Sequence, residues 1–271
     1  MKKRLDLLLV ERGLADSRTR AQALVLEGKV RVAGEVERKA SRQLDDGAAL
    51  AVESPPRFVS RGGEKLEGAF AKWPSLSAAG KTCLDVGSST GGFTDCLLQH
   101  GAARVMAVDV GTNQLAWKLR ADPRVWVREN YNARYMVAAD LPHVPTLAVT
   151  DVSFISLKLI LPPIASVLAP GGEIVALIKP QFEVGKGHAP GGLVRDDALR
   201  VAARDDIVAF ATETLGLTLL GLDESPIRGR EMGNIEYLSY WKKPGQQGQT
   251  PQGTAMNPTR PPTTSGSPSP A

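Results

Sequence analysis

The sequence predicts an α/β fold with a mostly parallel, doubly wound sheet of seven strands, preceded by a small α+β domain. From residue 80 onward, apolar runs alternate with amphipathic segments. Runs such as EIVALI at 173–178 are almost continuously apolar, which is typical of parallel strands covered on both faces. Residues 1–53 instead show two helical patterns followed by alternating valines. A chain of 271 residues is long enough for both domains.

The composition is that of an ordinary globular protein, 42% hydrophobic and 23% charged. The most apolar region, 147–178, contains charged residues, so no stretch reaches the ~20 apolar residues of a membrane span. Asp6 and Glu11 interrupt the apolar N-terminal run, so we expect no export signal and a cytoplasmic location. Cys83 and Cys96 fall in strand-like and helix-like runs, which favours buried free thiols over a disulfide.

Positive charge is concentrated near the N-terminus. Residues 1–65 hold 14 Lys and Arg against 10 Asp and Glu, whereas the rest of the chain holds 19 of each. The formal net charge of +4 therefore belongs to the first quarter of the chain, whose partner we expect to be an anion. The histidines, His100, His143 and His188, lack the spacing of metal ligands, and no metal site is expected.

Two short helices are predicted in the first domain. Leucines recur at helical spacing within 4–12, and Gly13 ends that helix. Ser17 can cap a second helix, which ends at Gly28. A tight turn therefore separates the two helices.

A small sheet is predicted after these helices. The segment GKVRVAGEVERK alternates about a glycine turn. This alternation places Val30, Val32 and Val36 on one face and Arg31 on the other, and residues 48–52 can add a strand. Basic side chains gather along the helices and the first strand. The predicted basic face comprises Arg4, Arg12, Arg18, Arg20, Lys29 and Arg31.

These features resemble the S4 RNA-binding domain. The run that carries the resemblance is RLDLLLVERGLADSRTRAQALVLEGKVRVAGEVERKAS. The resemblance implies that the basic face follows a phosphate backbone and fixes the position of an RNA without reading its bases. The alternative is an ordinary solvated face of charged residues.

Strands and helices alternate after a predicted linker at 54–62, where prolines break the periodicity. The second domain is placed at 63–243. Its predicted strands are 82–87, 104–110, 125–129, 147–152, 173–179, 217–222 and 235–241. Its predicted helices lie near 92–100, 113–121, 156–168 and 197–215, with a further helix opened by Lys65. Residues 244–271 are rich in Gly, Pro, Gln, Ser and Thr, which predicts a disordered tail.

The motif CLDVGSSTGGFTDCLLQHG predicts a strand, a glycine-rich turn and a helix. Gly87, Gly91 and Gly92 permit a ligand to approach the backbone closely. The spacing Asp-x-Gly-x-x-x-Gly-Gly-Phe differs from the Gly-x-Gly-x-x-Gly of dinucleotide folds, which disfavours a pyrophosphate. Asp85 would repel a phosphate but attract the cationic amino-acid part of S-adenosylmethionine.

An acidic residue also ends the second strand. Asp109 occupies the position from which a carboxylate can bond ribose hydroxyls. The third strand ends near Asn130 and Asn132, whose amides can meet an adenine edge. A plain chain reversal is the alternative reading of the glycine-rich turn. The predicted cofactor site comprises Asp85, Gly87, Ser88, Ser89, Thr90, Gly91, Gly92, Phe93, Asp109, Asn130, Asn132 and Asp151.

Four charged residues are the candidate catalytic groups: Lys65, Asp151, Lys179 and Glu236. Ligands of open parallel sheets bind at the carboxyl ends of the strands, where Asp151 and Lys179 are predicted to lie. A ribose hydroxyl is a poor nucleophile at neutral pH, so attack on a sulfonium methyl needs a group that accepts or orients its proton. We assign this role to Lys179.

The protonation state of Lys179 stays open at this stage. Burial and the neighbouring charge of Lys65 favour a neutral lysine that removes a proton. Asp151 and Glu236 orient and balance the ammonium groups, and they oppose the neutral form. Lys179 therefore either accepts the proton of the hydroxyl or orients the hydroxyl.

Two aromatic residues and a loop complete the expected site. Phe154 and Phe182 either wall the site, stacking on a base or excluding water, or belong to an ordinary core. The stretch EVGKGHAPGGLVRDD is glycine-rich and irregular. It is either a mobile loop that closes over RNA, with Lys186 near a phosphate, or a passive surface loop.

Taken in order, the motifs closely resemble the TlyA ribosomal RNA 2′-O-methyltransferases, which join an S4 domain to a methyltransferase domain of the FtsJ/RrmJ type. The motifs are VSRGGEKL, LDVGSSTGGFTDCLL, DVSFIS, KPQFEVGKG and GNIEY, and the resemblance covers roughly 3–242. It implies a Rossmann-like class I methyltransferase fold and a Lys-Asp-Lys-Glu tetrad at the four residues named above. The implied reaction transfers a methyl group from S-adenosylmethionine to the 2′-hydroxyl of a cytidine in 16S or 23S ribosomal RNA, or in both. PRFV, before Ser60, departs from the Arg-Ala-Trp-Val linker of some members.

Two hypotheses from other classes stand beside this one. A non-catalytic RNA-binding or ribosome-assembly protein would keep a vestigial cofactor pocket, and measuring methyl transfer separates it from an enzyme. A membrane-acting protein is suggested because relatives carry the label hemolysin, although the sequence has no membrane span. The expected partner is ribosomal RNA or a ribosomal subunit, with no membrane.

Overall fold

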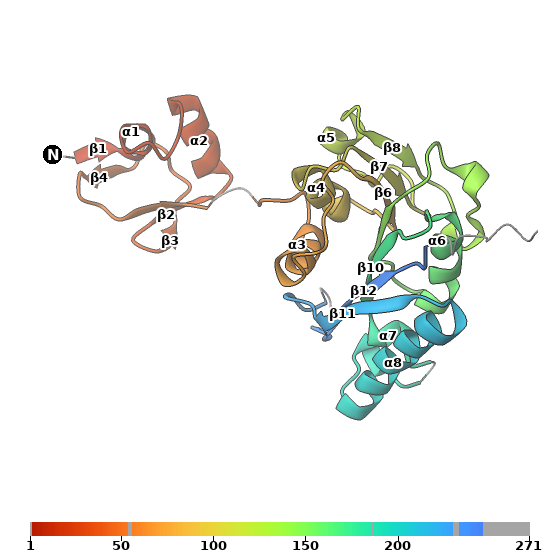
Figure 1. The fold of residues 1–271 in the computed structure, drawn as a ribbon. Helices are drawn as coiled ribbons and strands as arrows, with labels where there is room; N and C mark the ends of the chain where they lie inside the picture. The colour runs from red at the N-terminus through yellow and green to blue at the C-terminus, as the bar shows by residue number, and fades with distance from the viewer. Residues whose placement is uncertain (1, 54–55, 186, 230–232, 246–271) are drawn as a thin grey trace, which may run out of the picture. The chain divides into compact units, whose positions relative to one another are not determined.

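The computed structural model describes residues 2–53, 56–185, 187–229 and 233–245. It divides into two compact units, Met1–Arg57 and Phe58–Ala271 (Figure 1). The tail that we predicted from residue 244 lies, from 246 onward, outside the described residues. None of the helices described is long and apolar enough to span a membrane.

The first unit packs two helices against short strands. Its elements are β1 (Lys2–Arg4), α1 (Leu5–Glu11), α2 (Arg18–Leu26), β2 (Val30–Val32), β3 (Glu35–Val36), β4 (Gln43–Asp45) and β5 (Leu50–Val52). β1 pairs with β4, and β3, β2 and β5 form a second, antiparallel sheet. Leu5, Leu8 and Leu9 of α1 are fully buried, as their spacing predicted, whereas Leu7 faces outward. The hydroxyl of Ser17 caps α2 by accepting a hydrogen bond from the backbone N–H of Arg20 at 3.2 Å.

Two details of this unit differ from the sequence prediction. Val36 is exposed, because it pairs with Arg31 across the hairpin and so shares that residue's face of the sheet. Val30 and Val32 are buried, as predicted. The pairing of β1 with β4 was missed, since strands of three residues are too short to show alternation.

The second unit contains the large sheet. Its strands are β6 (Thr82–Val86), β7 (Arg104–Val108), β8 (Val125–Arg128), β9 (Leu147–Thr150), β10 (Glu173–Ile178), β11 (Thr218–Glu224) and β12 (Tyr237–Lys242). Their order is β11-β12-β10-β9-β6-β7-β8. β12 runs antiparallel to its neighbours β10 and β11, and the other pairings are parallel. The predicted mostly parallel sheet of seven strands is confirmed.

Helices cover both faces of this sheet (Figure 1). The helices are α3 (Gly62–Lys72), α4 (Gly92–Gln99), α5 (Trp117–Arg120), α6 (Leu161–Val167), α7 (Pro180–Glu183) and α8 (Asp197–Ala209). The short 3₁₀ helices are η1 (Ala133–Tyr135), η2 (Ala138–Asp140), η3 (Leu157–Leu159) and η4 (Pro190–Gly192), and η5 (Phe210–Thr214) is a π-helix. Alternate residues of each strand face opposite ways. Cys83 packs in the core cluster with α3, α4 and α5, whereas Leu84 packs in the cluster with α6 and α8.

Several helices are shorter than predicted, for identifiable reasons. The segment 113–115 points its backbone N–H groups at the carboxylate of Glu129, at 2.8–3.1 Å, so the predicted helix at 113–121 shrinks to α5. Prolines 162 and 163 fit the first turn of α6 but not a helix interior, so the segment from 156 forms η3 before α6 begins. The short helix α7 was not predicted.

The second unit begins earlier than the boundary predicted from sequence. Phe58 is buried against Gly63, where a Cβ would lie only 2.3 Å from the Phe58 ring. The N–H of Val59 donates to Asp95 Oδ2 at 2.9 Å. Residues 58–62, which we placed in a linker, therefore pack on the second unit. Cys83 and Cys96 are buried free thiols, as predicted.

Candidate active site

A cavity of about 560 Å³ opens where the carboxyl ends of β6, β9 and β10 meet. Asp151 directly follows β9 and Lys179 directly follows β10. Because parallel neighbours end at the same edge of a sheet, these side chains and the glycine-rich turn after β6 reach one space. The sequence-predicted residues that line the cavity are Lys65, Gly87, Ser88, Ser89, Thr90, Gly92, Phe93, Asp151 and Lys179.

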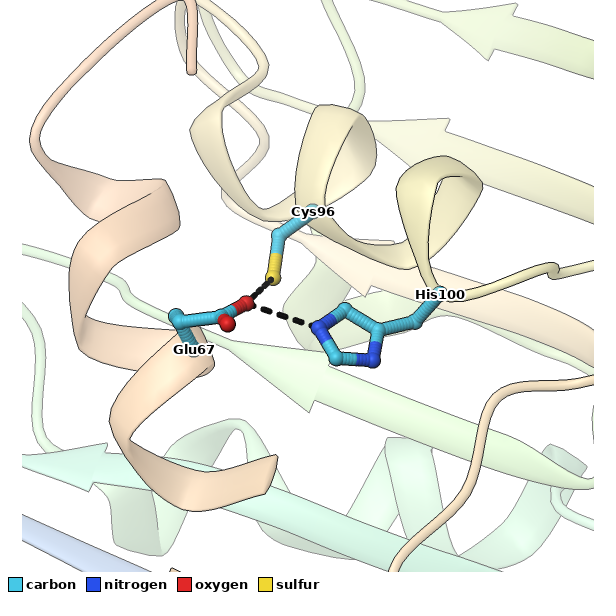
Figure 2. A group of neighbouring side chains, drawn as sticks. All are labelled: Glu67, Cys96 and His100. Carbon is cyan, nitrogen blue, oxygen red and sulfur yellow. Dashed lines mark hydrogen bonds and ion pairs between the residues drawn. The ribbon is translucent and has the colours of Figure 1, made fainter. Parts of the chain in front are cut away.

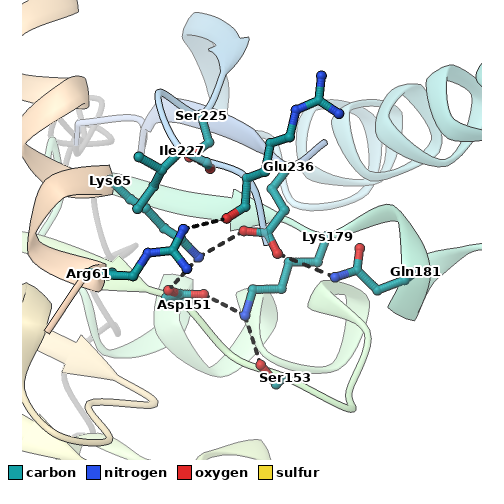
Figure 3. Close-up of polar contacts among 10 residues, drawn as sticks. Arg61, Lys65, Asp151, Ser153, Lys179, Gln181, Ser225, Ile227 and Glu236 are labelled. Atoms are coloured by element: carbon teal, nitrogen blue, oxygen red, sulfur yellow. Dashed lines mark hydrogen bonds and ion pairs between the residues drawn. The ribbon is translucent and has the colours of Figure 1, made fainter. Parts of the chain in front are cut away.

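The four predicted catalytic residues converge in the structure (Figure 3). Lys65 Nζ donates to Glu236 Oε2 at 2.8 Å and to Asp151 Oδ2 at 3.2 Å. Lys179 Nζ lies 2.6 Å from the other oxygen, Asp151 Oδ1. The order Lys179, Asp151, Lys65, Glu236 thus alternates in charge. All four belong to the second unit and lie in segments remote from one another in sequence.

Burial makes this alternation necessary. Lys65, Lys179 and Glu236 are buried, and a buried charge without a partner is strongly unfavourable. Burial alone would raise the pKa of Asp151, but the ammonium groups of Lys179 and Lys65 outweigh it and hold that pKa below its ordinary value. Asp151 therefore stays ionised at neutral pH, and the cluster alternates two basic with two acidic side chains.

Other side chains hold the tetrad in place. Lys179 Nζ also donates to Ser153 Oγ at 2.8 Å, so two acceptors on the segment after β9 fix the ammonium. Gln181, on α7, donates to the second oxygen of Glu236 at 3.3 Å (Figure 3). Because both oxygens of Glu236 are engaged and its side chain is only 3% exposed, its position is well defined.

Two arginines at the cavity were missed by sequence reasoning. Arg61 and Arg228 both line it, and both are exposed. The guanidinium of Arg61 donates to the backbone carbonyl of Arg228 at 3.1 Å, which ties the residue before α3 to the loop after β11. Arg61 lies within the VSRGGEKL motif and was open to detection. No sequence signal marks Arg228, which depends on a loop conformation.

The glycine-rich turn uses glycine for its backbone conformation and its close packing. Gly87 and Gly91 have positive φ values of 80° and 96°, which disfavour other residues. A Cβ at Gly91 would lie 2.3 Å from Leu119 Cδ1, so this glycine packs inward against α5. Ser88, Ser89 and Thr90 between the glycines face the cavity.

Asp85 lies beneath the turn rather than on the cavity wall. One oxygen accepts a hydrogen bond from Thr94 Oγ1 at 2.6 Å. Within the described part of the chain, the other oxygen, Oδ1, is buried without a hydrogen-bond partner. Burial raises the pKa of Asp85 to about 7, and the negative charges of Asp151 and Asp109 add to that effect. An unpartnered acidic oxygen at this depth suits a cationic ligand group above the turn.

Asp109 and the two asparagines follow the carboxyl ends of β7 and β8. Asp109 accepts backbone N–H bonds from Ser89 and Gly111, both at 2.7 Å, and so joins the glycine-rich turn to the end of β7. Asn132 caps η1 through its side chain. Asn130 adopts a positive φ of 53° and donates its N–H to Gly111. The cavity lining as described includes neither asparagine, so their predicted contact with adenine remains a prediction.

The two predicted aromatic residues form a pair next to Lys179. The rings of Phe154 and Phe182 lie 5.1 Å apart, and Lys179 Nζ lies 5.9 Å from the Phe182 ring. Phe154 is 84% exposed and has a positive φ of 63°, an unfavourable conformation for this residue type. It is therefore not an ordinary core residue.

The predicted basic face of the first unit is largely engaged within that unit. Arg4 and Arg18 both bind the buried carboxylate of Asp6, at 2.8 and 3.0 Å. Arg12 donates to the backbone carbonyls of Asp46 and Ala48. The remaining ion pairs join Arg31 to Glu53 at 2.9 Å and Lys29 to Glu27 at 2.5 Å. Lys186, the last predicted RNA contact, lies outside the described residues.

The parallel sheet, the glycine-rich turn and the cavity at the strand ends define a Rossmann-like class I methyltransferase. The FtsJ-like methyltransferase family matches residues 58–243, and the S4 domain family matches residues 3–50. The chain therefore belongs to the FtsJ-like methyltransferase family and carries an N-terminal S4 domain.

Individual relatives match almost the whole chain. The chain is 47% identical to YqxC of Bacillus subtilis over 92% of its own length and 89% of that protein. It is 46% identical to the 16S/23S rRNA (cytidine-2′-O)-methyltransferase TlyA of Mycobacterium tuberculosis, over 87% and 88% of the two chains. A solved structure from Streptococcus thermophilus, whose protein carries the name hemolysin, aligns with a TM-score of 0.68 at 44% identity over 92% of each chain.

Proposed function

We propose that this protein transfers a methyl group from S-adenosylmethionine to a ribose 2′-hydroxyl of ribosomal RNA, and that the target nucleotide is a cytidine. The observation that carries this proposal is the alternating cluster of Lys179, Asp151, Lys65 and Glu236 at the cavity. Such a cluster supplies groups that can position a neutral hydroxyl. The specific RNA is proposed from the similarity to TlyA of Mycobacterium tuberculosis.

S-adenosylmethionine, when bound, supplies an electrophilic methyl group on a positively charged sulfur. The protein aligns the hydroxyl oxygen with that methyl carbon, with the reacting atoms about 3–3.5 Å apart. Lys179 lies beside the cavity and contacts the hydroxyl, either accepting its proton or orienting its lone pair. Asp151 and Ser153 fix the Lys179 ammonium at 2.6 and 2.8 Å. Lys65 holds Asp151 in place and is itself held by Glu236.

The cofactor site is expected to respond to pH through Asp85. This carboxyl group, with a pKa of about 7, is mostly neutral at pH 6 and mostly ionised at pH 8. Only the ionised form attracts the cofactor ammonium. The affinity for S-adenosylmethionine should therefore rise up to about tenfold between these pH values, and Asp85→Asn should abolish the rise. Calorimetric titration of both proteins measures it.

The control for this experiment is Glu213→Gln, which removes an exposed carboxylate from the same unit and should leave the pH profile unchanged. An Asp85→Asn protein that kept the parental pH profile would contradict the role of Asp85. Asp109 and Asp151, whose negative charges also raise the pKa of Asp85, are unchanged in both variants.

RNA binding by the first unit is best tested at Arg20. Arg18 is unsuitable for charge reversal, because the change would remove one bond to the buried carboxylate of Asp6 and place a like charge beside it. Arg20 is exposed and contributes only its backbone N–H to the cap of α2. Arg20→Glu should weaken binding to ribosomal RNA and reduce the slope of log affinity against log salt by about 1.

The matched control is Arg104→Glu, which makes the same change of charge at an exposed position of the second unit. Filter binding at several salt concentrations gives both slopes. Equal slopes for the parent and Arg20→Glu proteins would show that Arg20 does not contact a phosphate.

Basic and aromatic side chains at the cavity suit an RNA substrate. The tetrad pairs its two basic side chains with two acidic ones, so a phosphodiester beside the target ribose needs another cationic partner. Arg61 and Arg228 line the cavity mouth and supply it. The exposed ring of Phe154 offers a stacking surface for a base turned out of its helix.

The reaction is tested by mapping 2′-O-methyl groups in ribosomal RNA from cells with and without this protein. A site present only with the protein supports the proposal and identifies the nucleotide. Identical maps would favour a non-catalytic RNA-binding protein.

A further inference from the structure

A second cluster of reactive side chains lies outside the tetrad, between α3 and α4 (Figure 2). Glu67 comes from α3, Cys96 from α4, and His100 from the residue that ends α4. Glu67 Oε2 lies 2.7 Å from His100 Nε2 and 3.8 Å from Cys96 Sγ. One oxygen, one sulfur and one nitrogen atom all lie within 4.8 Å of one another.

The local structure holds these groups together. Cys96 and His100 are four residues apart, which places them on one face of the helix. The ring of Phe70 stacks on the His100 imidazole, with centroids 4.0 Å apart and planes inclined by 15°. Cys96 is fully buried, whereas Glu67 and His100 are each 29% exposed. The cluster is thus partly open to solvent on one side.

We propose that Glu67, Cys96 and His100 bind a divalent cation of the zinc type, with water as the fourth ligand. Thiolate, imidazole and carboxylate are the protein ligands that Zn²⁺ takes, at about 2.0–2.3 Å in a tetrahedron. Such a tetrahedron separates its ligand atoms by about 3.3–3.6 Å. The oxygen and nitrogen, 2.7 Å apart, therefore move apart by less than about 1 Å, and the sulfur and oxygen, 3.8 Å apart, move closer by less than that.

The charge balance favours a divalent cation at this site. Binding replaces the thiol proton of Cys96, which passes to solvent, and keeps the imidazole of His100 neutral. The ion, one thiolate and the carboxylate of Glu67 then sum to zero charge in a half-buried place. The site differs from our expectation of no metal, which rested on histidine spacing alone. The Cys-x-x-x-His spacing within one helix was the signal available in the sequence.

The ion would act as a structural brace near the proposed active site. α3 carries Lys65 as well as Glu67, and α4 begins at the glycine-rich turn. An ion that links Glu67 of α3 to Cys96 of α4 would hold α3, and with it Lys65, against α4.

The experiment is titration of the full, metal-stripped protein with Co²⁺, followed by competition with Zn²⁺. A thiolate-to-cobalt absorption band at one equivalent per chain supports the proposal, as does a cobalt affinity that rises with pH as the thiol proton is released. His100→Gln, at a partly exposed position, should lower the affinity at least about tenfold, and Cys96→Ser should abolish the band.

The control is Cys83→Ser, which removes the other buried thiol. Burial raises the pKa of Cys83 to about 12, and this residue is not part of the cluster. Its variant should keep both the band and the affinity. No cobalt band in the parent, a band that survives Cys96→Ser, or unchanged affinity in His100→Gln would each overturn the proposal. The last of these outcomes does not depend on how the buried Cys96 variant folds.

Discussion

A Lys179→Ala protein is expected to methylate ribosomal RNA about 10²–10⁴-fold more slowly than the parent, the range typical of lost proton transfer or hydroxyl positioning. The change removes the ammonium that Asp151 and Ser153 hold at 2.6 and 2.8 Å beside the cavity. Single-turnover transfer of a labelled methyl group measures the rate. Circular dichroism and cofactor binding establish that the variant folds and keeps its cofactor site.

The matched control for this variant is Lys158→Ala. Lys158 is a lysine of the same unit, and it pairs with Asp206 away from the tetrad. Its loss should leave the rate within about twofold of the parent, as expected for a surface pair. Native-rate transfer by a folded, cofactor-binding Lys179→Ala protein would refute the role of Lys179.

Glu236→Ala should lower the free energy of unfolding of the second unit by about 3–5 kcal/mol, because it leaves the buried ammonium of Lys65 with one carboxylate instead of two. Glu236 is 3% exposed and lies 2.8 Å from Lys65. Denaturant unfolding followed by tryptophan fluorescence measures the loss. Asp206→Ala breaks an exposed pair and should cost less than about 1 kcal/mol.

A double variant separates structure from catalysis at this pair. Lys65→Met with Glu236→Leu replaces the ion pair by apolar side chains of similar size and should recover much of the lost stability. It should be inactive, because Asp151 loses Lys65, one of the two lysines that hold it. A stable double variant with the parental rate of methyl transfer would show that this half of the tetrad is dispensable.

The fold and the tetrad were largely predictable because both follow from where strands end. Asp151 and Lys179 each follow an apolar run, and parallel strands bring such positions to one edge of the sheet. The glycine-rich turn was predictable for the same reason. Lys65 and Glu236 were placed through their motifs, and their contacts required coordinates.

The features that were missed depend on contacts between remote segments. Asp6 was treated only as an interruption of an apolar run, yet its buried carboxylate binds Arg4 and Arg18. A count of basic residues cannot show which of them are already paired. Arg228 reaches the cavity from an irregular loop.

The role of Asp85 was only partly predictable. Its place at a strand end was read correctly, but the structure buries it beneath the turn and not on the cavity wall. The hydrogen bond from Thr94 and the unpartnered Oδ1 follow from how α4 packs over β6. This burial results from the packing of a helix against the sheet, which the sequence pattern alone does not show.

The most direct measurement uses purified protein, ribosomal RNA and S-adenosylmethionine labelled in its methyl group. After transfer, the RNA is digested to nucleosides and the labelled product is identified. If the ionic tetrad methylates the ribose 2′-hydroxyl, the label will be found in 2′-O-methylcytidine. The Lys179→Ala protein will not produce this labelled nucleoside. Label on a base carbon or nitrogen, or no transfer by a folded protein that binds both substrates, would contradict it.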